Sequence, residues 1–147
     1  MALDYGRRRI GVSVSDPTGT IASPRGFIDR GPPPRRSGKS VAMPPGLPDD
    51  LLELVLEVRP SRILVGIPLM MDGSAGEMAQ EARAFAGALA EATGVEVIEW
   101  DERLTTARAE REIQSLGLRK SRREKKGRSD EMAATLMLTD YLRSVST

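Results

Sequence analysis

The chain has 147 residues, enough for one domain with a hydrophobic core and too few for two, so we expect a single domain over residues 1–147. It contains no cysteine and no histidine, which excludes disulfides, zinc–thiolate centres, a thiol nucleophile and imidazole catalysis. No apolar run approaches the ~20 residues of a membrane span and no signal peptide is recognisable, so we expect a soluble, cytoplasmic protein without membrane contact.

The net charge of +1 conceals a strongly basic segment between positions 119 and 128. This basic segment carries a local charge of +6, because its seven basic residues face Glu124 alone. Its basic residues are Arg119, Lys120, Arg122, Arg123, Lys125, Lys126 and Arg128. Such a run is either a solvated loop or a contact for the phosphates of a nucleic acid.

The first half of the chain has the pattern of an antiparallel meander. A first strand ends near Asp4, Gly6 and the arginines after it allow a tight turn, and residues 10–15 alternate apolar with small or polar side chains. Residues 21–28 are a candidate third strand. The segment 31–48 holds six of the ten prolines and predicts an irregular loop, since proline lacks the backbone donor of regular structure.

The second half alternates helices with short apolar strands. The predicted elements are a helix over 49–58, a strand over 63–67, a helix that carries Met78 to Leu89 and is closed by Gly94, and a strand over 95–100. Thr105 or Thr106 can cap a further helix. Ser129 can cap the last helix, which is expected to end near Arg143. The order of elements predicts an α/β fold, with a mixed five-stranded sheet flanked by helices.

Three acidic positions, far apart in the sequence, converge in this arrangement. Asp4 ends the first strand and Asp101-Glu102 end the last, so both lie at the carboxyl edge of the sheet, where α/β proteins bind ligands. Asp130 starts the final helix, on the face that packs against the sheet. Each acid alone has an ordinary explanation, as a turn former, a solvated strand end or a favourable charge on the helix dipole. Together, beside a basic segment, they favour a site for Mg²⁺ or Mn²⁺.

Four segments, which together span nearly the whole chain, resemble the YqgF or RuvX-type proteins, a family of pre-16S rRNA nucleases related to Holliday junction resolvases. They are LDYG at 3–6 with RIGVSVSD at 9–16, VGIPLMMDGS at 65–74, DERLTT at 101–106 and DEMAA at 130–134. The resemblance implies an RNase H-like fold and a divalent-metal-dependent nuclease. It implies catalytic, metal-binding roles for Asp4, Glu102 and Asp130, with Asp101 as the alternative to Glu102.

Nucleic-acid contacts are expected on both sides of these acids. Arg103 and the basic segment flank Glu102 and Asp130 in the sequence, so their positive field can hold the phosphates of RNA or DNA. Arg7 and Arg8 follow shortly after Asp4 and are further candidates. Thr105 and Thr106 are candidate phosphate ligands, with helix capping as the competing role for at least one of them.

The alternative function is a noncatalytic nucleic-acid-binding protein that acts in ribosome maturation or recombination. With only five aromatic residues, base stacking is not expected to dominate, and recognition of backbone and shape is expected instead. Precursor rRNA and branched or single-stranded DNA are all compatible with the sequence, as are exonuclease and endonuclease action, and monomer and homodimer.

The start of the chain differs from the family pattern. Only three residues precede Asp4, whereas strands usually have about five, so we expect the native chain to begin upstream of Met1. An N-terminal peptide that begins at Met1 or Ala2 in the protein from its own cells would contradict this expectation. The loop over 31–48 is also longer and richer in proline than in the family.

A first prediction concerns the basic segment, which lies between two of the proposed metal ligands. Replacing Lys125 and Lys126 with alanine should weaken nucleic-acid binding about equally for all sequences. The slope of log K against log salt should flatten by roughly 0.7 to 0.9 for each phosphate contact that is lost. Fluorescence anisotropy across a salt series measures this slope, and an unchanged slope would identify the segment as a solvated loop.

Overall fold

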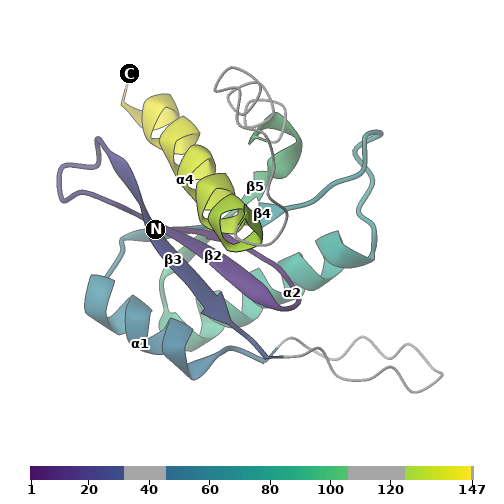
Figure 1. The fold of residues 1–147 in the computed structure, drawn as a ribbon, viewed down its shortest axis with the longest axis horizontal. Coiled ribbons are helices and arrows are strands. Elements are labelled where there is room, and N and C mark those ends of the chain that lie inside the picture. The colour runs from purple at the N-terminus through teal and green to yellow at the C-terminus, as the bar shows by residue number, and fades with distance from the viewer. Residues whose placement is uncertain (32–45, 106–124, 147) are drawn as a thin grey trace.

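A computed structural model describes residues 1–31, 46–105 and 125–146 of the chain. Five strands form one sheet in the order β3-β2-β1-β4-β5 (Figure 1). The strands are β1 (Ala2–Asp4), β2 (Arg9–Ser15), β3 (Ala22–Asp29), β4 (Arg62–Ile67) and β5 (Glu96–Asp101). The helices of the described ranges include α1 (Asp49–Val58), α2 (Glu77–Thr93) and α4 (Lys125–Val145).

The sheet is mixed, and its two halves differ in strand direction. β1 pairs antiparallel with β2, and β2 with β3, whereas β1 and β4, and β4 and β5, are parallel. The predicted meander followed by parallel strands is therefore confirmed. Asp4 lies opposite Gly11 of β2 in this register, and Leu3 lies opposite Val65 of β4.

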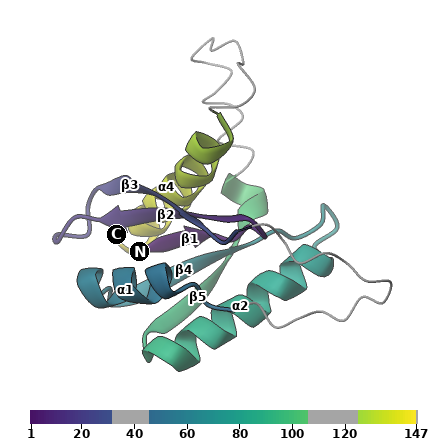
Figure 2. The same ribbon diagram turned by 60° about the horizontal axis from the view of Figure 1, so that its bottom comes forward.

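Helices cover both faces of the sheet: α1 and α2 on one side and α4 on the other (Figure 2). Alternate residues of a strand point to opposite faces. Leu3 accordingly packs into the core under α1 and α2, whereas Ala2 packs with Met137 of α4. Asp4, two residues after Ala2, thus points to the α4 face. Burying a large side chain such as Leu3 stabilises the fold by about 2 kcal/mol. This burial therefore determines which residues of β1 face the core and which face α4.

The ends of α1 and α2 follow the sequence signals. α1 begins with two aspartates, whose charges favour the positive end of the helix dipole, and ends before Pro60. α2 ends at Gly94, which adopts the left-handed conformation at φ 68°. The predicted bounds of α1 and the predicted closure of α2 are therefore confirmed. None of the helices in the described ranges is both long and apolar enough to cross a membrane.

The helix after β5 begins earlier than predicted, because residues 102–105 are already helical. Asp101 takes the capping role, since its Oδ1 atom accepts a hydrogen bond of 3.0 Å from the backbone N–H of Arg103. Thr105 lies inside this turn, so the prediction that it caps the helix was wrong. Thr106, the other candidate cap, lies outside the described residues.

The last helix also begins earlier than predicted. α4 starts at Lys125, so Ser129 lies within the helix and does not cap it. Lysine and arginine have good helix propensity, and a single glycine such as Gly127 costs a helix only about 1 kcal/mol. The end of the basic segment is thus helical, which corrects the prediction of a loop there, while residues 106–124 lie outside the described part. The proline-rich loop falls mostly on residues 32–45, which are also outside it.

Candidate functional site

The centre of the candidate site is a pair of carboxyl groups, Asp4 at the end of β1 and Glu102 directly after β5. Burial, followed by the neighbouring charges of Glu102 and Asp130, raises the pKa of Asp4 to about 9. Burial also raises the pKa of Glu102, although the hydrogen bond from Asp4 opposes this rise. The protonated Asp4 carboxyl therefore donates to the Glu102 carboxylate, and the pair shares a proton.

Two glycines on the strands beside β1 make room for the acids. Gly66 of β4 lies under the Glu102 side chain, since a Cβ atom built on Gly66 would lie 2.9 Å from Cγ and 3.0 Å from Cδ of Glu102. Gly11, opposite Asp4 on β2, lies under the backbone of α4, where an added Cβ would meet the carbonyl group of Asp130. Asp4 thus has a glycine, which carries no side chain, on the neighbouring strand at each side.

Asp130 is the third acid of the group and comes from α4. It is half-buried, and its charge contributes to the raised pKa of Asp4. Among the described residues, no three acidic side chains as placed form a group that could hold a metal ion. A three-carboxylate site would therefore require Asp130 to move closer to the Asp4–Glu102 pair.

The donor set fits a divalent cation of the Mg²⁺ or Mn²⁺ type. Carboxylate oxygens are the ligands that these hard cations prefer, and the sequence offers them neither imidazole nor thiolate. The raised pKa of Asp4 shows that its ionised form is costly in this buried site, and a bound cation would offset that cost.

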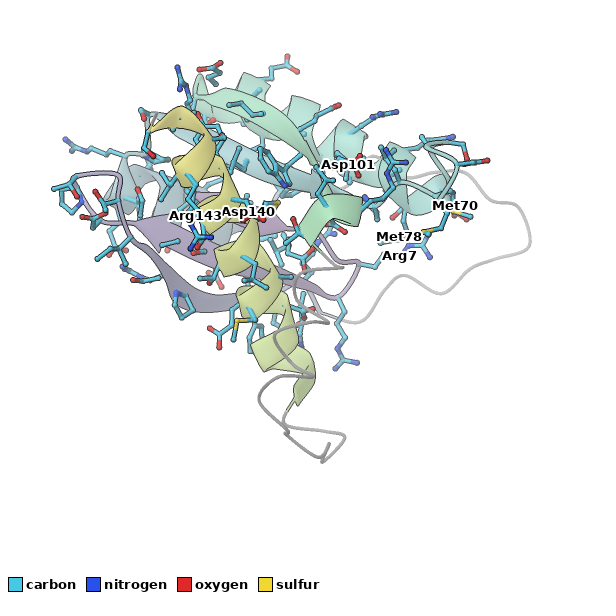
Figure 3. The ribbon with its side chains drawn as sticks, turned by 90° about the horizontal axis from the view of Figure 1, so that it is seen from above. Arg7, Met70, Met78, Asp101, Asp140 and Arg143 are labelled. Carbon is cyan, nitrogen blue, oxygen red and sulfur yellow. The ribbon has the colours of Figure 1, made fainter. Side chains whose placement is uncertain are left out.

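Asp101, the alternative to Glu102, has a different environment. Its carboxylate accepts hydrogen bonds from Nε and Nη2 of Arg103, the latter at 2.7 Å, and these contacts lower the pKa of Asp101. Its place in the structure is shown in Figure 3. Asp101 therefore anchors Arg103 and caps the helical turn, whereas Glu102 reaches Asp4. These contacts favour Glu102 as the metal ligand.

Arg7 faces away from the carboxyl pair. Its guanidinium donates to both carboxylate oxygens of Glu81 of α2, at 2.6 Å from Nη2 and at 3.0 and 3.2 Å from Nε, and its Nη2 lies 3.1 Å from Glu77. The Tyr5 hydroxyl donates to the same Glu81 at 3.4 Å. Arg7 thus ties the turn after β1 to α2, and Arg8 is exposed beside it.

These contacts predict a structural effect for Arg7. Replacing Arg7 with alanine should lower the free energy of unfolding by no more than about 1 kcal/mol, because the ion pair is partly exposed. Nucleic-acid affinity and its salt dependence should change little, since Arg7 already has carboxylate partners. Denaturant unfolding and anisotropy titrations measure the two quantities, and a large drop in affinity with unchanged stability would restore Arg7 as a phosphate contact.

The remaining predicted residues are placed as follows. Thr105 is buried and accepts a hydrogen bond of 3.3 Å from the Trp100 indole, so its hydroxyl is used inside the protein. Thr106 and residues 119–124 of the basic segment lie outside the described part. The backbone of Lys125, Lys126 and Arg128 forms the first turn of α4. The sequence did not predict that Gly11 and Gly66 leave room for the α4 backbone at Asp130 and for the Glu102 side chain. An isolated glycine within a strand pattern is the signal that points to such a close approach.

Comparison with known proteins identifies the family. The model of the RuvX family, described as Holliday junction resolvase, matches residues 1–144. The chain belongs to the RuvX family. A protein of Chloroflexus aurantiacus named "Putative pre-16S rRNA nuclease" is 38% identical over 142 residues, which are 97% of this chain and 84% of that protein. A RuvX relative of the same name from Pelotomaculum thermopropionicum is 40% identical over 144 residues, with 98% and 86% of the two chains covered.

A solved structure shows the same fold. The chain of T. thermophilus RuvC in complex with a Holliday junction substrate matches with a TM-score of 0.51 and 20% sequence identity. The match covers 98% of this chain and 94% of the RuvC chain. The RNase H-like fold implied by the sequence is therefore confirmed.

Proposed function

We propose that this protein is a divalent-metal-dependent nuclease that hydrolyses phosphodiester bonds in structured nucleic acid, with precursor 16S rRNA as its leading substrate. The observation that carries the proposal is the half-buried, hydrogen-bonded pair of Asp4 and Glu102, together with the charge of Asp130, which acts on Asp4. Buried carboxyl groups in contact are costly to a fold, which is why such pairs gather where a cation or a reaction uses them.

Asp4, Glu102 and Asp130 are the residues that would hold Mg²⁺ or Mn²⁺. When bound, the ion would lower the pKa of an attacking water and neutralise charge on the phosphate. In this proposal Asp4 at the end of β1 and Glu102 after β5 would be the first two ligands, and Asp130 of α4 would become the third by moving closer to them.

The choice of substrate rests on the relatives. RuvX relatives at 38% and 40% identity are named for precursor 16S rRNA, while the family description names the Holliday junction. Because these full-length relatives carry that name, precursor rRNA is the leading substrate. A four-way DNA junction is the second substrate to be tested.

The test compares a precursor-16S rRNA fragment, a four-way junction and single-stranded DNA in Mg²⁺, in Mn²⁺ and in EDTA. Cleavage of the rRNA fragment in Mg²⁺ or Mn²⁺, and none in EDTA, is the expected result. Glu102→Gln should lose this cleavage, and Asp101→Asn should retain most of it because Asn can still cap the turn. Tight binding without cleavage of any substrate would favour the noncatalytic alternative, and cleavage in EDTA would contradict metal dependence.

A further inference from the structure

Arg9, the first residue of β2, lies on the same face of the sheet as Asp4. Its neighbours Ile10 and Val12 pack into the core under α1 and α2, and Gly11 lies under the α4 backbone. Because side chains alternate along a strand, Arg9 points to the α4 side, as Gly11 does. Two residues of an antiparallel strand span about 6.8 Å, so Arg9 lies one such step beyond Gly11, past the carboxyl end of β1.

The Arg9 side chain is held in place without an acidic partner. Its guanidinium carbon lies 4.9 Å from the centre of the Phe27 ring, a cation–π arrangement. Its Nε atom is buried and finds no hydrogen-bond acceptor within the described segments, where Arg9 also makes no ion pair. Five other arginines of these segments do pair with carboxylates, namely Arg7, Arg25, Arg62, Arg83 and Arg103.

A buried donor without an acceptor is costly, so the position favours a ligand that supplies one. The ligand must be anionic, because a guanidinium makes its strongest hydrogen bonds to carboxylate or phosphate oxygens. Arg9 also lies on the same face of the sheet as Asp4 and just past the end of β1, so its ligand would approach on the face where a phosphodiester would be cleaved. A phosphate of a nucleic-acid strand meets both conditions.

We propose that Arg9 binds a phosphate of the nucleic-acid strand beside the Asp4–Glu102 pair, and that Phe27 is the positioning residue that orients the Arg9 guanidinium. This inference rests on the proposed nuclease function, whose site it extends. The contact is independent of base sequence, because every nucleotide carries the same phosphate. It also supplies positive charge where the acids would otherwise repel the approaching strand.

The experiment measures binding in an Asp4→Asn background in Mg²⁺, so that cleavage does not consume the probe. The probes are two fluorescently labelled RNA strands of unrelated sequence, titrated across a salt series. Arg9→Ala and Arg9→Gln should each weaken binding about tenfold to both strands and flatten the slope of log K against log salt by roughly 0.7 to 0.9. Arg9→Lys should keep the wild-type slope, because the charge remains.

Phe27→Leu should produce a smaller loss of affinity with the same salt slope, because the charge stays while its orientation loosens. Arg143→Ala is the matched control, since it removes the same charge from the far end of α4 (Figure 3). Its affinity and slope should equal those of the background protein. Melting temperatures identify any variant that fails to fold, and Arg9→Gln keeps much of the packing on Phe27 in case Arg9→Ala does not.

An unchanged slope in both Arg9→Ala and Arg9→Gln would overturn the proposal. So would an equal loss in Arg143→Ala, which would indicate a general charge effect, or a loss confined to one RNA sequence, which would indicate a base contact. Failure of the nuclease function has a different signature, because it appears as absence of cleavage by the wild-type protein. The binding measurements with the Arg9 variants do not depend on that result.

Discussion

Asp4→Asn is expected to abolish cleavage while the fold stays intact. Asparagine nearly preserves the shape of the side chain but offers a neutral oxygen in place of a charged metal ligand. The loss of several kcal/mol of transition-state stabilisation corresponds to roughly a 10³-fold fall in the cleavage rate. Single-turnover cleavage of the precursor-16S rRNA fragment in Mn²⁺ measures this fall.

The same substitution should leave the metal-free protein as stable as the wild type, or more stable. Burial, the Glu102 charge and its hydrogen bond raise the pKa of Asp4 to about 9 in the folded protein, from an unfolded value of 3.8. An acid with a raised folded pKa loses stability as the pH rises from its unfolded value to its folded value. The asparagine side chain does not titrate, so the gain of Asp4→Asn over wild type should grow between about pH 4 and pH 9. Thermal melts in EDTA across this range give the comparison.

Asp49→Asn is the matched control, because it makes the same chemical change on α1, which covers the opposite face of the sheet. It should leave cleavage at the wild-type rate. Full cleavage by a cleanly purified Asp4→Asn protein would contradict the assignment of Asp4. A lower melting temperature for Asp4→Asn in EDTA would contradict the charge cost at this position.

Gly66→Ala should reduce cleavage by about 100-fold with little loss of stability. The added methyl group would collide with Oε1 of Glu102 and lie 2.9 Å from its Cγ, so the Glu102 side chain must move. Displacement of a catalytic group by about 1 Å can cost roughly 10²-fold in rate. The fold itself should tolerate the change, because the colliding atoms belong to a side chain, and alanine also restricts the unfolded chain more than glycine does.

Gly11→Ala provides the contrast, since it makes the same change on the other side of Asp4. Here the added Cβ would meet the backbone of Asp130 and lie 2.9 Å from the Glu131 nitrogen, so α4 itself would have to shift. Overpacking of this kind typically costs about 1–3 kcal/mol. We therefore expect a clear fall in the melting temperature for Gly11→Ala and a small change for Gly66→Ala. Similar stability losses in both variants would contradict this account of the two glycines.

Several features of the fold could be predicted because their signals are local. The alternation of residues 10–15 and the apolar run 63–67 identify β2 and β4, and α1 was placed between its first aspartate and Pro60. The helix starts after β5 and at α4 were missed. After β5 the helix starts earlier because Asp101 caps it, ahead of the expected threonine. α4 starts earlier because the lysines and arginine before Ser129 favour helix.

The sequence by itself determined which chemistry is available to this protein. Without histidine or cysteine, the groups left for catalysis are carboxylates, hydroxyls, lysine, arginine and any bound metal, and the positions of Asp4 and Glu102 at strand ends follow from hydrophobic periodicity. Only the tertiary structure decided the roles of their neighbours. Asp101 and Glu102 are adjacent in sequence, yet one pairs with Arg103 and the other with Asp4, because the turn after β5 points them apart.

The arginines near Asp4 follow the same rule. Arg7 and Arg9 cannot be told apart from the sequence. In the structure Arg7 pairs with the carboxylates of α2, whereas Arg9 lies against Phe27, on the face of the sheet that carries Asp4. The tertiary structure decides this division, since it depends on the register of β1 against β2 and on which helix covers each face of the sheet. Periodicity predicts that side chains alternate, and packing decides which partner each one meets.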